Sequence, residues 1–259
     1  MHRILRDIVK AVAEEIQKRK NEPSLEDLTS YGRLPFKERI LNPKAGDIGL
    51  IAEVKLASPT EGNLGKKVDI LNRLQEYQHA GADAVSIITE NKTFKGDIHL
   101  VATVKRSTLG LPILQKDFVI DEFQIKESCR LGADALLLIV RIINEEQLER
   151  FVKLCKEKKL EPVVEICSED DLVKAVKSGA EIIAVNARDL DTFEVDVNKA
   201  CKLLRRIPEK FIKLGFSGIH SRTEVEKYKL VGAKAVLVGT ELMKTSNINK
   251  LIMELKNAS

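Results

Sequence analysis

Four apolar segments of the chain end in charged or amide side chains, and the lysines and glutamates among them are of the types that transfer protons. In chain order these side chains are Glu53, Lys55, Lys116, Glu165, Asn186 and Arg188. A single charge at the end of a strand usually meets only solvent. Two lysines and two carboxylates that converge on one partly dry pocket would instead shift each other's pKa values, as general acid–base catalysis near neutral pH requires.

Small residues follow the last two apolar segments of the chain. These are the pairs Ser217-Gly218 and Gly239-Thr240. Such pairs after the last strands of a barrel expose backbone N–H groups, which bind phosphate there. The sequence therefore predicts a site for a small phosphorylated anion.

Eight short apolar runs alternate with amphipathic segments, a pattern typical of strands that are buried on both faces and covered by helices. The predicted strands are Ile48–Val54, Ala84–Glu90, Pro112–Phe118, Ala135–Val140, Glu161–Ile166, Ile182–Arg188, Phe211–Ser217 and Ala235–Thr240. The predicted helices between and after them are Ile70–Ala80, Ile98–Thr108, Glu122–Leu131, Glu145–Glu157, Glu169–Ser178, Lys199–Ile207, Arg222–Val231 and Ile248–Lys256.

A glycine repeat supports the count of eight units. Gly81, Gly132, Gly179 and Gly232 each close a predicted helix, followed by Ala and then Asp, Glu or Lys. We expect each of them in a left-handed conformation that a Cβ would strain. Their spacing of about fifty residues equals two βα units, which predicts the α/β class and a (βα)8 TIM barrel. A doubly wound sheet is the alternative, but no GxGxxG loop follows the first strand.

The chain before the first strand carries its own helical pattern. Residues 1–46 are predicted to form an N-terminal helical extension packed on the barrel, with a helix over Ile4–Lys20, and residues 47–259 form the barrel, one domain overall. The extension could be a simple docked helix or a lid over one rim. Either role leaves the oligomeric state open.

Composition narrows the classes of function. The 43 Lys and Arg nearly balance the 39 Asp and Glu, so the net charge of +4 favours neither nucleic acid nor a membrane as a partner. There is no apolar leader and no stretch of about 18 uncharged apolar residues, so we expect a soluble cytoplasmic protein. The 4 cysteines lack CxxC spacing, which argues against a disulfide framework or a zinc site.

Three aspartates could be imagined as magnesium ligands. They are Asp117, Asp189 and Asp191, and each lies beside a basic residue or in a turn. Carboxylates in such positions usually bond to the local backbone, so we expect a structural role for them. The histidines lie within helices, near helix starts or in a loop, which is typical of surface or capping residues.

Taken together, several motifs resemble indole-3-glycerol phosphate synthase of tryptophan biosynthesis, over nearly the whole chain. They are Ile51-Ala52-Glu53-Val54-Lys55 with Ser58-Pro59, Ile113-Leu114-Gln115-Lys116-Asp117-Phe118, Val164-Glu165, Asn186-Ala187-Arg188-Asp189-Leu190 and Ser217-Gly218-Ile219. The resemblance implies ring closure of 1-(2-carboxyphenylamino)-1-deoxyribulose 5-phosphate to indole-3-glycerol phosphate. Carbon dioxide and water are lost, and no metal or organic cofactor is used.

The resemblance also implies roles for five catalytic residues. Lys116 protonates or polarises the ribulose carbonyl, and Lys55 lies near the substrate carboxylate as a possible second acid. Glu165 acts as a base or stabilises the cationic intermediate. Glu53 pairs with the lysines, and Asn186 positions the substrate hydroxyls.

The remaining implied site residues bind the substrate or its phosphate, and they are Ser58, Arg188, Ser217, Gly218, Gly239 and Thr240. Arg188 and Ser217 complete the polar wall, while the two glycine-containing pairs hold the phosphate. Association with other enzymes of tryptophan synthesis is a further partnership that the resemblance suggests.

Two positions depart from the family pattern. Phe216 stands where the family usually has Glu, and Leu56 stands where it often has Arg. The missing carboxylate would leave nearby cations less compensated, so an impaired, ancestral or engineered barrel is one alternative. Another phosphate-binding barrel, such as phosphoribosylanthranilate isomerase, is a second alternative, although no Cys ends the first strand. A non-catalytic or redesigned scaffold with a lysine Schiff base is a third.

Overall fold

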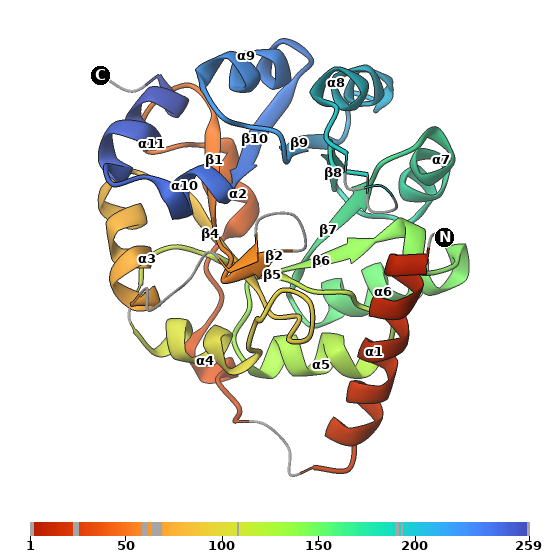
Figure 1. Cartoon of the computed structure of the whole chain (residues 1–259). Helices are drawn as coiled ribbons and strands as arrows, with labels where there is room; N and C mark the ends of the chain where they lie inside the picture. Colours follow the sequence, from red (N-terminus) through yellow and green to blue (C-terminus); the bar gives the residue numbers. More distant parts are fainter. Residues whose placement is uncertain are drawn as a thin grey trace.

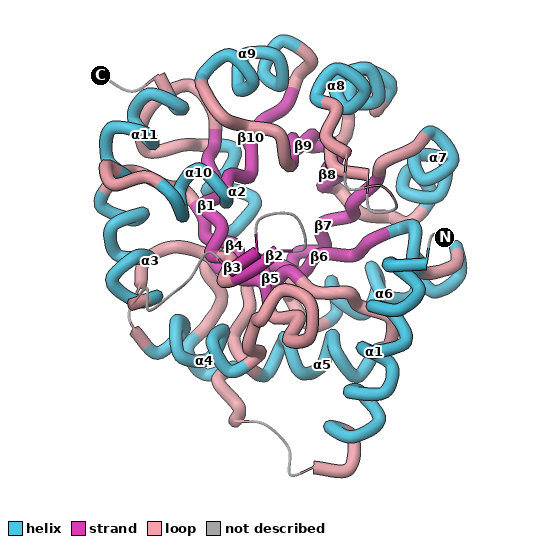
Figure 2. Tube along the Cα trace, in the orientation of Figure 1, coloured by secondary structure: helices cyan, strands magenta, loops and turns pink. Residues whose placement is uncertain are grey.

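The computed structural model describes residues 3–22, 26–58, 62–63, 69–107, 109–189, 192 and 194–257, with the side chains of Arg3, Ser58 and Asn63 left out. Its centre is a closed barrel of parallel strands in the order β1-β10-β9-β8-β7-β6-β5-β4 (Figures 1 and 2). The strands are β1 Gly49–Val54, β4 Ala84–Ile88, β5 Ile113–Lys116, β6 Ala135–Ile139, β7 Glu161–Ile166, β8 Ile182–Asn186, β9 Ile212–Phe216 and β10 Ala233–Val238. The predicted (βα)8 barrel is confirmed.

Helices surround the barrel and cover the outward faces of its strands (Figure 1). The helices that follow the strands are α3 Ile70–His79, α4 His99–Arg106, α5 Glu122–Arg130, α6 Glu145–Glu157, α7 Glu169–Lys177, α8 Val197–Arg206, α9 Arg222–Leu230 and α11 Ile248–Lys256. Several start at a capping side chain, as when Asn144 accepts the N–H of Gln147 in a capping box. The predicted end of one helix at Thr108 lies outside the described residues.

Within the described residues, several short elements were not predicted. They are the 3-10 helices η1 Thr29–Tyr31 and η2 Val140–Ile142, the helices α2 Phe36–Leu41 and α10 Thr240–Lys244, and the antiparallel hairpin of β2 Ala57–Ser58 and β3 Gly62–Asn63. The sequence had predicted that Thr240 ends a strand, but in the structure it begins the helix α10. The predicted strands ending at Glu90, Phe118 and Arg188 also stop two residues earlier than predicted.

The glycine repeat takes the expected backbone conformation. The φ angles are 93° at Gly81, 86° at Gly132, 81° at Gly179 and 89° at Gly232, all in the region that disfavours side chains. Each glycine reverses the chain directly after a helix and delivers it to the next strand. The repeat thus sets the point at which each of these strands enters the barrel.

The aspartates that follow two of these glycines stabilise the end of the barrel where the strands begin. Asp83 accepts the N–H of Leu50 at 2.9 Å and pairs with the buried Lys256 ammonium at 2.7 Å. Asp134 accepts a backbone N–H at the start of β5 at 2.9 Å and pairs with Lys105 at 2.9 Å. Buried carboxylates of this kind are tolerated because every contact supplies a donor.

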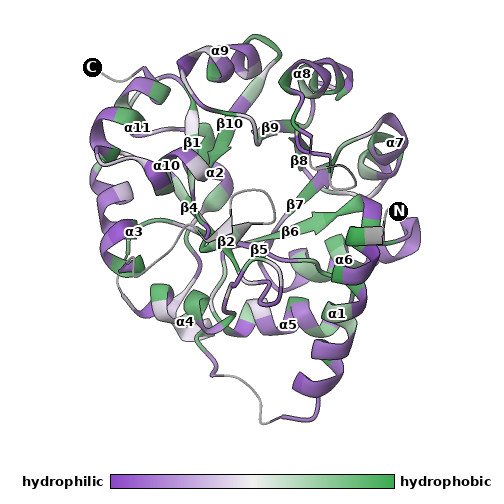
Figure 3. Cartoon of the chain, in the orientation of Figure 1, coloured by the Kyte–Doolittle hydropathy of each residue, from purple (hydrophilic) through white to green (hydrophobic). Residues whose placement is uncertain are grey.

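Apolar side chains form two layers. One cluster lies between the strands and the surrounding helices, and the second fills the barrel and continues into α1 Arg3–Arg19 and α2. In Figure 3 strands such as β6 and β10 are largely hydrophobic, whereas the outer helices carry mixed colours. No helix in the described part of the chain is long and apolar enough to cross a membrane.

The predicted N-terminal helix is confirmed within one residue as α1. Its apolar face, with Leu5, Ile8, Val12 and Ile16, belongs to the same cluster as the barrel interior. Phe118, which follows β5, belongs to this cluster too, and Phe94 and Phe123 pack against it. The division of the chain at residue 46 stays a prediction.

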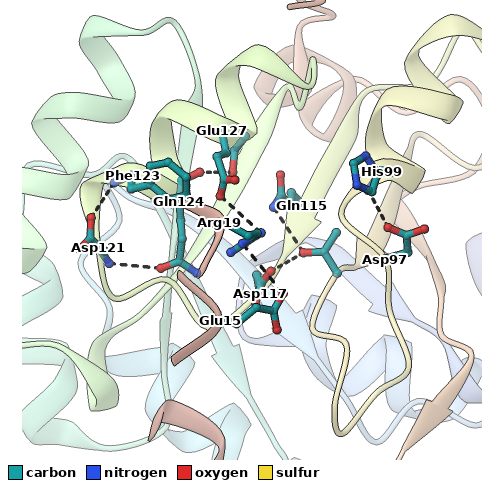
Figure 4. A network of polar contacts seen from close by, with 12 residues as sticks. Glu15, Arg19, Asp97, His99, Gln115, Asp117, Asp121, Phe123, Gln124 and Glu127 are labelled. Atoms are coloured by element: carbon teal, nitrogen blue, oxygen red, sulfur yellow. Dashed lines mark hydrogen bonds and ion pairs between the residues drawn. The ribbon is translucent and has the colours of Figure 1, made fainter. Parts of the chain in front are cut away.

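A buried ion pair joins α1 to α5. The guanidinium of Arg19 lies 3.4 Å from the Glu127 carboxylate, and Glu15 and Asp117 lie close by (Figure 4). Burial raises the pKa of Glu127 to about 7, with Arg19 opposing the shift and Asp117 adding to it. One guanidinium thus has to compensate more than one carboxylate at this junction.

Glu127→Gln tests this junction through the free energy of unfolding. A carboxyl whose pKa rises from 4.5 to about 7 on folding destabilises the fold when ionised. The free energy of unfolding therefore falls as the pH rises through this range, by up to about 3 kcal/mol. We expect the variant to be more stable than the parent at pH 8 and to gain less at pH 5, measured by urea unfolding. Glu122→Gln, at a half-buried position on the same helix where the carboxylate pairs with Arg150 at 2.7 Å, is the control. An equal gain at both pH values would contradict the assignment.

Candidate active site

One buried carboxylate holds both lysines of the predicted site. Glu53 on β1 is 3% exposed, and its Oε1 lies 3.7 Å from Nζ of Lys55, which follows β1 by one residue. Its Oε2 lies 3.4 Å from Nζ of Lys116, the last residue of β5. Alternate residues of β1 therefore point to the same side, as the strand period requires, and they meet β5 in the barrel mouth.

A second carboxylate lies on the other side of Lys116. Glu165 on β7 is also 3% exposed, and its Oε1 accepts the Nδ2–H of Asn186 at 3.2 Å. The Asn186 Oδ1 in turn accepts the backbone N–H of Arg188 at 3.0 Å. This second bond fixes the amide orientation, so that the NH2 group of Asn186 faces Glu165.

The ionisation of Lys116 and Glu165 is coupled. Burial lowers the pKa of Lys116, but Glu53 and Glu165 raise it, and the net result is a pKa above the usual lysine value. Burial raises the pKa of Glu165, while Lys116 and the Asn186 hydrogen bond oppose the rise. Lys116 is therefore a charged proton donor, and Glu165 is a carboxylate with increased proton affinity.

The first lysine also contacts the end of the last strand. Nζ of Lys55 donates to Oγ1 of Thr240 at 3.0 Å, across the entrance to α10. Directly before it, a Cβ on Gly239 would lie 2.5 Å from Oε1 of Glu53. Gly239 is thus required for space, because any side chain there would displace the carboxylate between the lysines.

Ser217 and Gly218 form a left-handed turn at the end of β9. Their φ angles are 68° and 71°, and the Tyr228 hydroxyl of α9 contacts the carbonyls of Phe216 at 3.2 Å and Ser217 at 3.0 Å. In a trans peptide the N–H points opposite to the C=O. The N–H groups of Ser217 and Gly218 therefore point away from Tyr228. Tyr228 lies on a helix outside the motifs, so no motif points to this contact.

The structure thus brings together most of the predicted site residues. The charge of Arg188 partly opposes the rise in the pKa of Lys116, which indicates that Arg188 lies on the same side of the barrel. The side chain of Ser58 lies outside the described atoms, as does the whole of Pro59. Phe216 is 1% exposed and belongs to the apolar cluster inside the barrel.

The aspartates considered as magnesium ligands have other partners. Asp117 accepts the Thr89 hydroxyl at 2.5 Å and the Phe118 N–H at 2.7 Å, and Asp189 lies 3.4 Å from Arg141. Asp191 lies outside the described residues. Within the described ranges, no group of three or more His, Cys, Asp or Glu is arranged to hold a metal ion.

Known proteins of one family match this chain over almost its whole length. A family model described as indole-3-glycerol phosphate synthase matches residues 5–255. Similar proteins of that name come from Caldanaerobacter subterraneus subsp. tengcongensis, 39% identical over 93% of both chains, and Endomicrobium trichonymphae, 37% identical over 98% of this chain and 100% of the relative. The solved 3-hexulose-6-phosphate synthase of Salmonella typhimurium shares the fold, with a TM-score of 0.66 and 14% identity, covering 81% of this chain and 97% of the other.

Gly239→Ala tests the contact between β10 and the shared carboxylate. The new Cβ would push Glu53 away from the lysines, and displacements near 1 Å can cost about a hundredfold in rate. We expect the kcat/KM of the enzyme to fall at least about tenfold, while the midpoint of thermal unfolding changes little. Gly110→Ala, where the nearest atom is 3.8 Å away, is the control, and equal rates for both variants would disprove the steric role.

Proposed function

Because the chain belongs to the indole-3-glycerol phosphate synthase family, we propose that Lys116 is the acid that starts indole-ring closure in this barrel. The enzyme is a carboxy-lyase, and its substrate is 1-(2-carboxyphenylamino)-1-deoxyribulose 5-phosphate. The observation that carries the proposal is the single buried carboxylate of Glu53 between two ammonium groups.

Lys116 acts on the ribulose carbonyl. As the aromatic carbon that bears the carboxylate attacks it, a C–C bond forms, and the Lys116 ammonium gives a proton to the carbonyl oxygen. The ring is then cationic, and the loss of carbon dioxide returns the bonding electrons and restores its aromatic character. The pKa of Lys116, raised by Glu53 and Glu165, keeps this donor charged at neutral pH.

Glu165 serves the second half of the reaction. Dehydration requires a proton for the departing hydroxyl and removal of a proton from the neighbouring carbon. Burial raises the pKa of Glu165, so this carboxylate suits proton uptake, and before that its charge stabilises the cationic ring. Asn186, already bonded to Glu165, positions the substrate hydroxyls, and Arg188 completes the polar wall.

The phosphate binds at the ends of β9 and β10. The N–H groups of Ser217 and Gly218 and the turn at Gly239 and Thr240 supply donors, and Ser58 contributes from the first loop. The Lys55 ammonium lies near Glu53 and donates to Thr240 at 3.0 Å, so it stands between the catalytic carboxylate and the proposed phosphate site. In this orientation Lys55 is an electrostatic anchor for the substrate and the second acid after Lys116.

The cellular setting is a further part of the proposal. We place the enzyme in the cytoplasm, acting on a small phosphorylated anion without nucleic acid. The family suggests association with other enzymes of tryptophan synthesis. Residues 1–46 and 47–259 would act as one domain, since α1, α2 and the barrel share an apolar cluster.

Lys116→Met tests the proposed acid. The variant keeps the apolar stem and loses the ammonium, so we expect kcat to fall about a thousandfold, within the range attributed to general acids. Product formation is followed by indole fluorescence, and the fold by circular dichroism. Lys153→Met, exposed on α6, is the control. Turnover at the parental rate in the Lys116 variant would eliminate the mechanism.

Phe216→Glu tests whether the departure from the family pattern limits turnover. The new carboxylate would stand beside Asn186 in the strand register and compensate nearby cations, so we expect a higher kcat. Phe216 is buried among apolar side chains, so the same change should lower the thermal midpoint. Phe216→Leu separates the two effects, because it removes the ring without adding charge. An unchanged or lower kcat for the Glu variant would show that Phe216 does not limit this enzyme.

A further inference from the structure

A single threonine contacts three consecutive residues of β5 and the turn after it. Thr89, directly after β4 and 4% exposed, donates its hydroxyl to Oδ2 of Asp117 at 2.5 Å. Its backbone N–H donates to the carbonyl of Lys116 at 3.1 Å. Its Oγ1 also accepts the Nε2–H of Gln115 at 3.3 Å. Together these bonds hold the C-terminal end of β5 against β4.

Asp117 is the buried member of this arrangement. Its second oxygen accepts the N–H of Phe118 at 2.7 Å, so both carboxylate oxygens have donors. Burial raises the pKa of Asp117, and the bonds from Thr89 and Phe118 and the charge of Arg19 oppose this rise. In Figure 4 Asp117 lies next to Arg19 of α1, below Gln115 of β5. Removing the Thr89 hydroxyl would leave one oxygen of a buried carboxylate without its donor.

Lys116 lies between these anchored neighbours and points the other way. Side chains of a strand alternate, so Gln115 and Asp117 are on the face opposite to Lys116. The Lys116 side chain then reaches Glu53 at 3.4 Å inside the barrel mouth. Since its backbone is fixed on the opposite face, a shift of that backbone would move the ammonium relative to Glu53 and Glu165.

We propose that Thr89, acting through its hydroxyl and Asp117, is a positioning residue for Lys116. It touches neither the substrate nor the reacting atoms, and it sets where the ammonium stands when the ribulose carbonyl arrives. The inference rests on the proposed acid role of Lys116. It extends the site to the outward face of β4 and β5.

Thr89→Val and Thr89→Ser form the deciding pair of variants. Valine keeps the shape and the backbone N–H but loses the hydroxyl, whereas serine keeps the hydroxyl. We expect the valine variant to lower kcat about tenfold and to change KM less than about twofold, because the ground-state contacts stay in place. The serine variant should recover kcat to within about threefold of the parent. The alkaline fall of kcat/KM in the valine variant should come at lower pH, since Glu53 no longer raises the Lys116 pKa as strongly.

Two controls separate positioning from general loss of structure. Ser128→Ala removes another buried hydroxyl, which donates at 2.7 Å to Gln124 within α5, and it should leave kcat unchanged. Asp117→Asn removes the charged acceptor of the Thr89 bond, and combining it with Thr89→Val should slow turnover no further than the slower single variant. Thermal midpoints are measured for every variant.

The outcomes divide cleanly. Parental kcat in Thr89→Val, equal losses in the valine and serine variants, or a rise in KM alone would each overturn the positioning role while the acid role of Lys116 stands. Parental turnover in Lys116→Met would remove the proposed function and this inference together. Loss of kcat in valine, recovery in serine and an earlier alkaline fall would support the proposal.

Discussion

The site depends on one buried carboxylate shared by two ammonium groups. Glu53 is almost fully enclosed, and a charge in that position is tolerable only with cations close by. Lys55 directly follows the strand that carries Glu53, and Lys116 comes from β5, two places around the closed sheet. The curvature of the barrel sheet across β1, β4 and β5 brings both ammonium groups within 4 Å of the Glu53 carboxylate. The space for Glu53 is in turn left open by Gly239, which directly follows the other neighbouring strand, β10.

The second carboxylate, Glu165, has a different environment from Glu53. Glu165 raises the pKa of Lys116 without touching Glu53, and Asn186 holds it through an amide that is itself fixed by the Arg188 backbone. One carboxylate is thus tied to the lysines and the other to an amide. That difference in environment allows a cation and a proton acceptor to exist side by side, which the two halves of the ring closure require.

Much of the fold followed from local pattern. Apolar runs, helix caps and the glycine repeat each depend on neighbouring residues, so strands, helices and their order could be predicted. The convergence of Glu53, Lys55, Lys116 and Glu165 also followed, because strand ends in a barrel meet at one rim. The contact of Lys55 with Thr240, the hydroxyl of Tyr228 and the bonds of Thr89 join distant segments. No local pattern specifies such contacts, and the short helix α10 was missed since its five residues are too few to show a period.

The two aspartates of the glycine repeat also receive N–H groups from the segment before the barrel. Asp83 accepts from Lys44 at 3.0 Å, and Asp134 accepts from Leu34 at 2.7 Å. A gene shortened to begin at the first strand would therefore encode a barrel with two under-satisfied acids at its base. Minimal versions of this scaffold, or circular permutants that relocate its start, have to keep that leading stretch, because neutral residues in place of the two aspartates would leave the buried Lys256 and Lys105 ammonium groups without their partners.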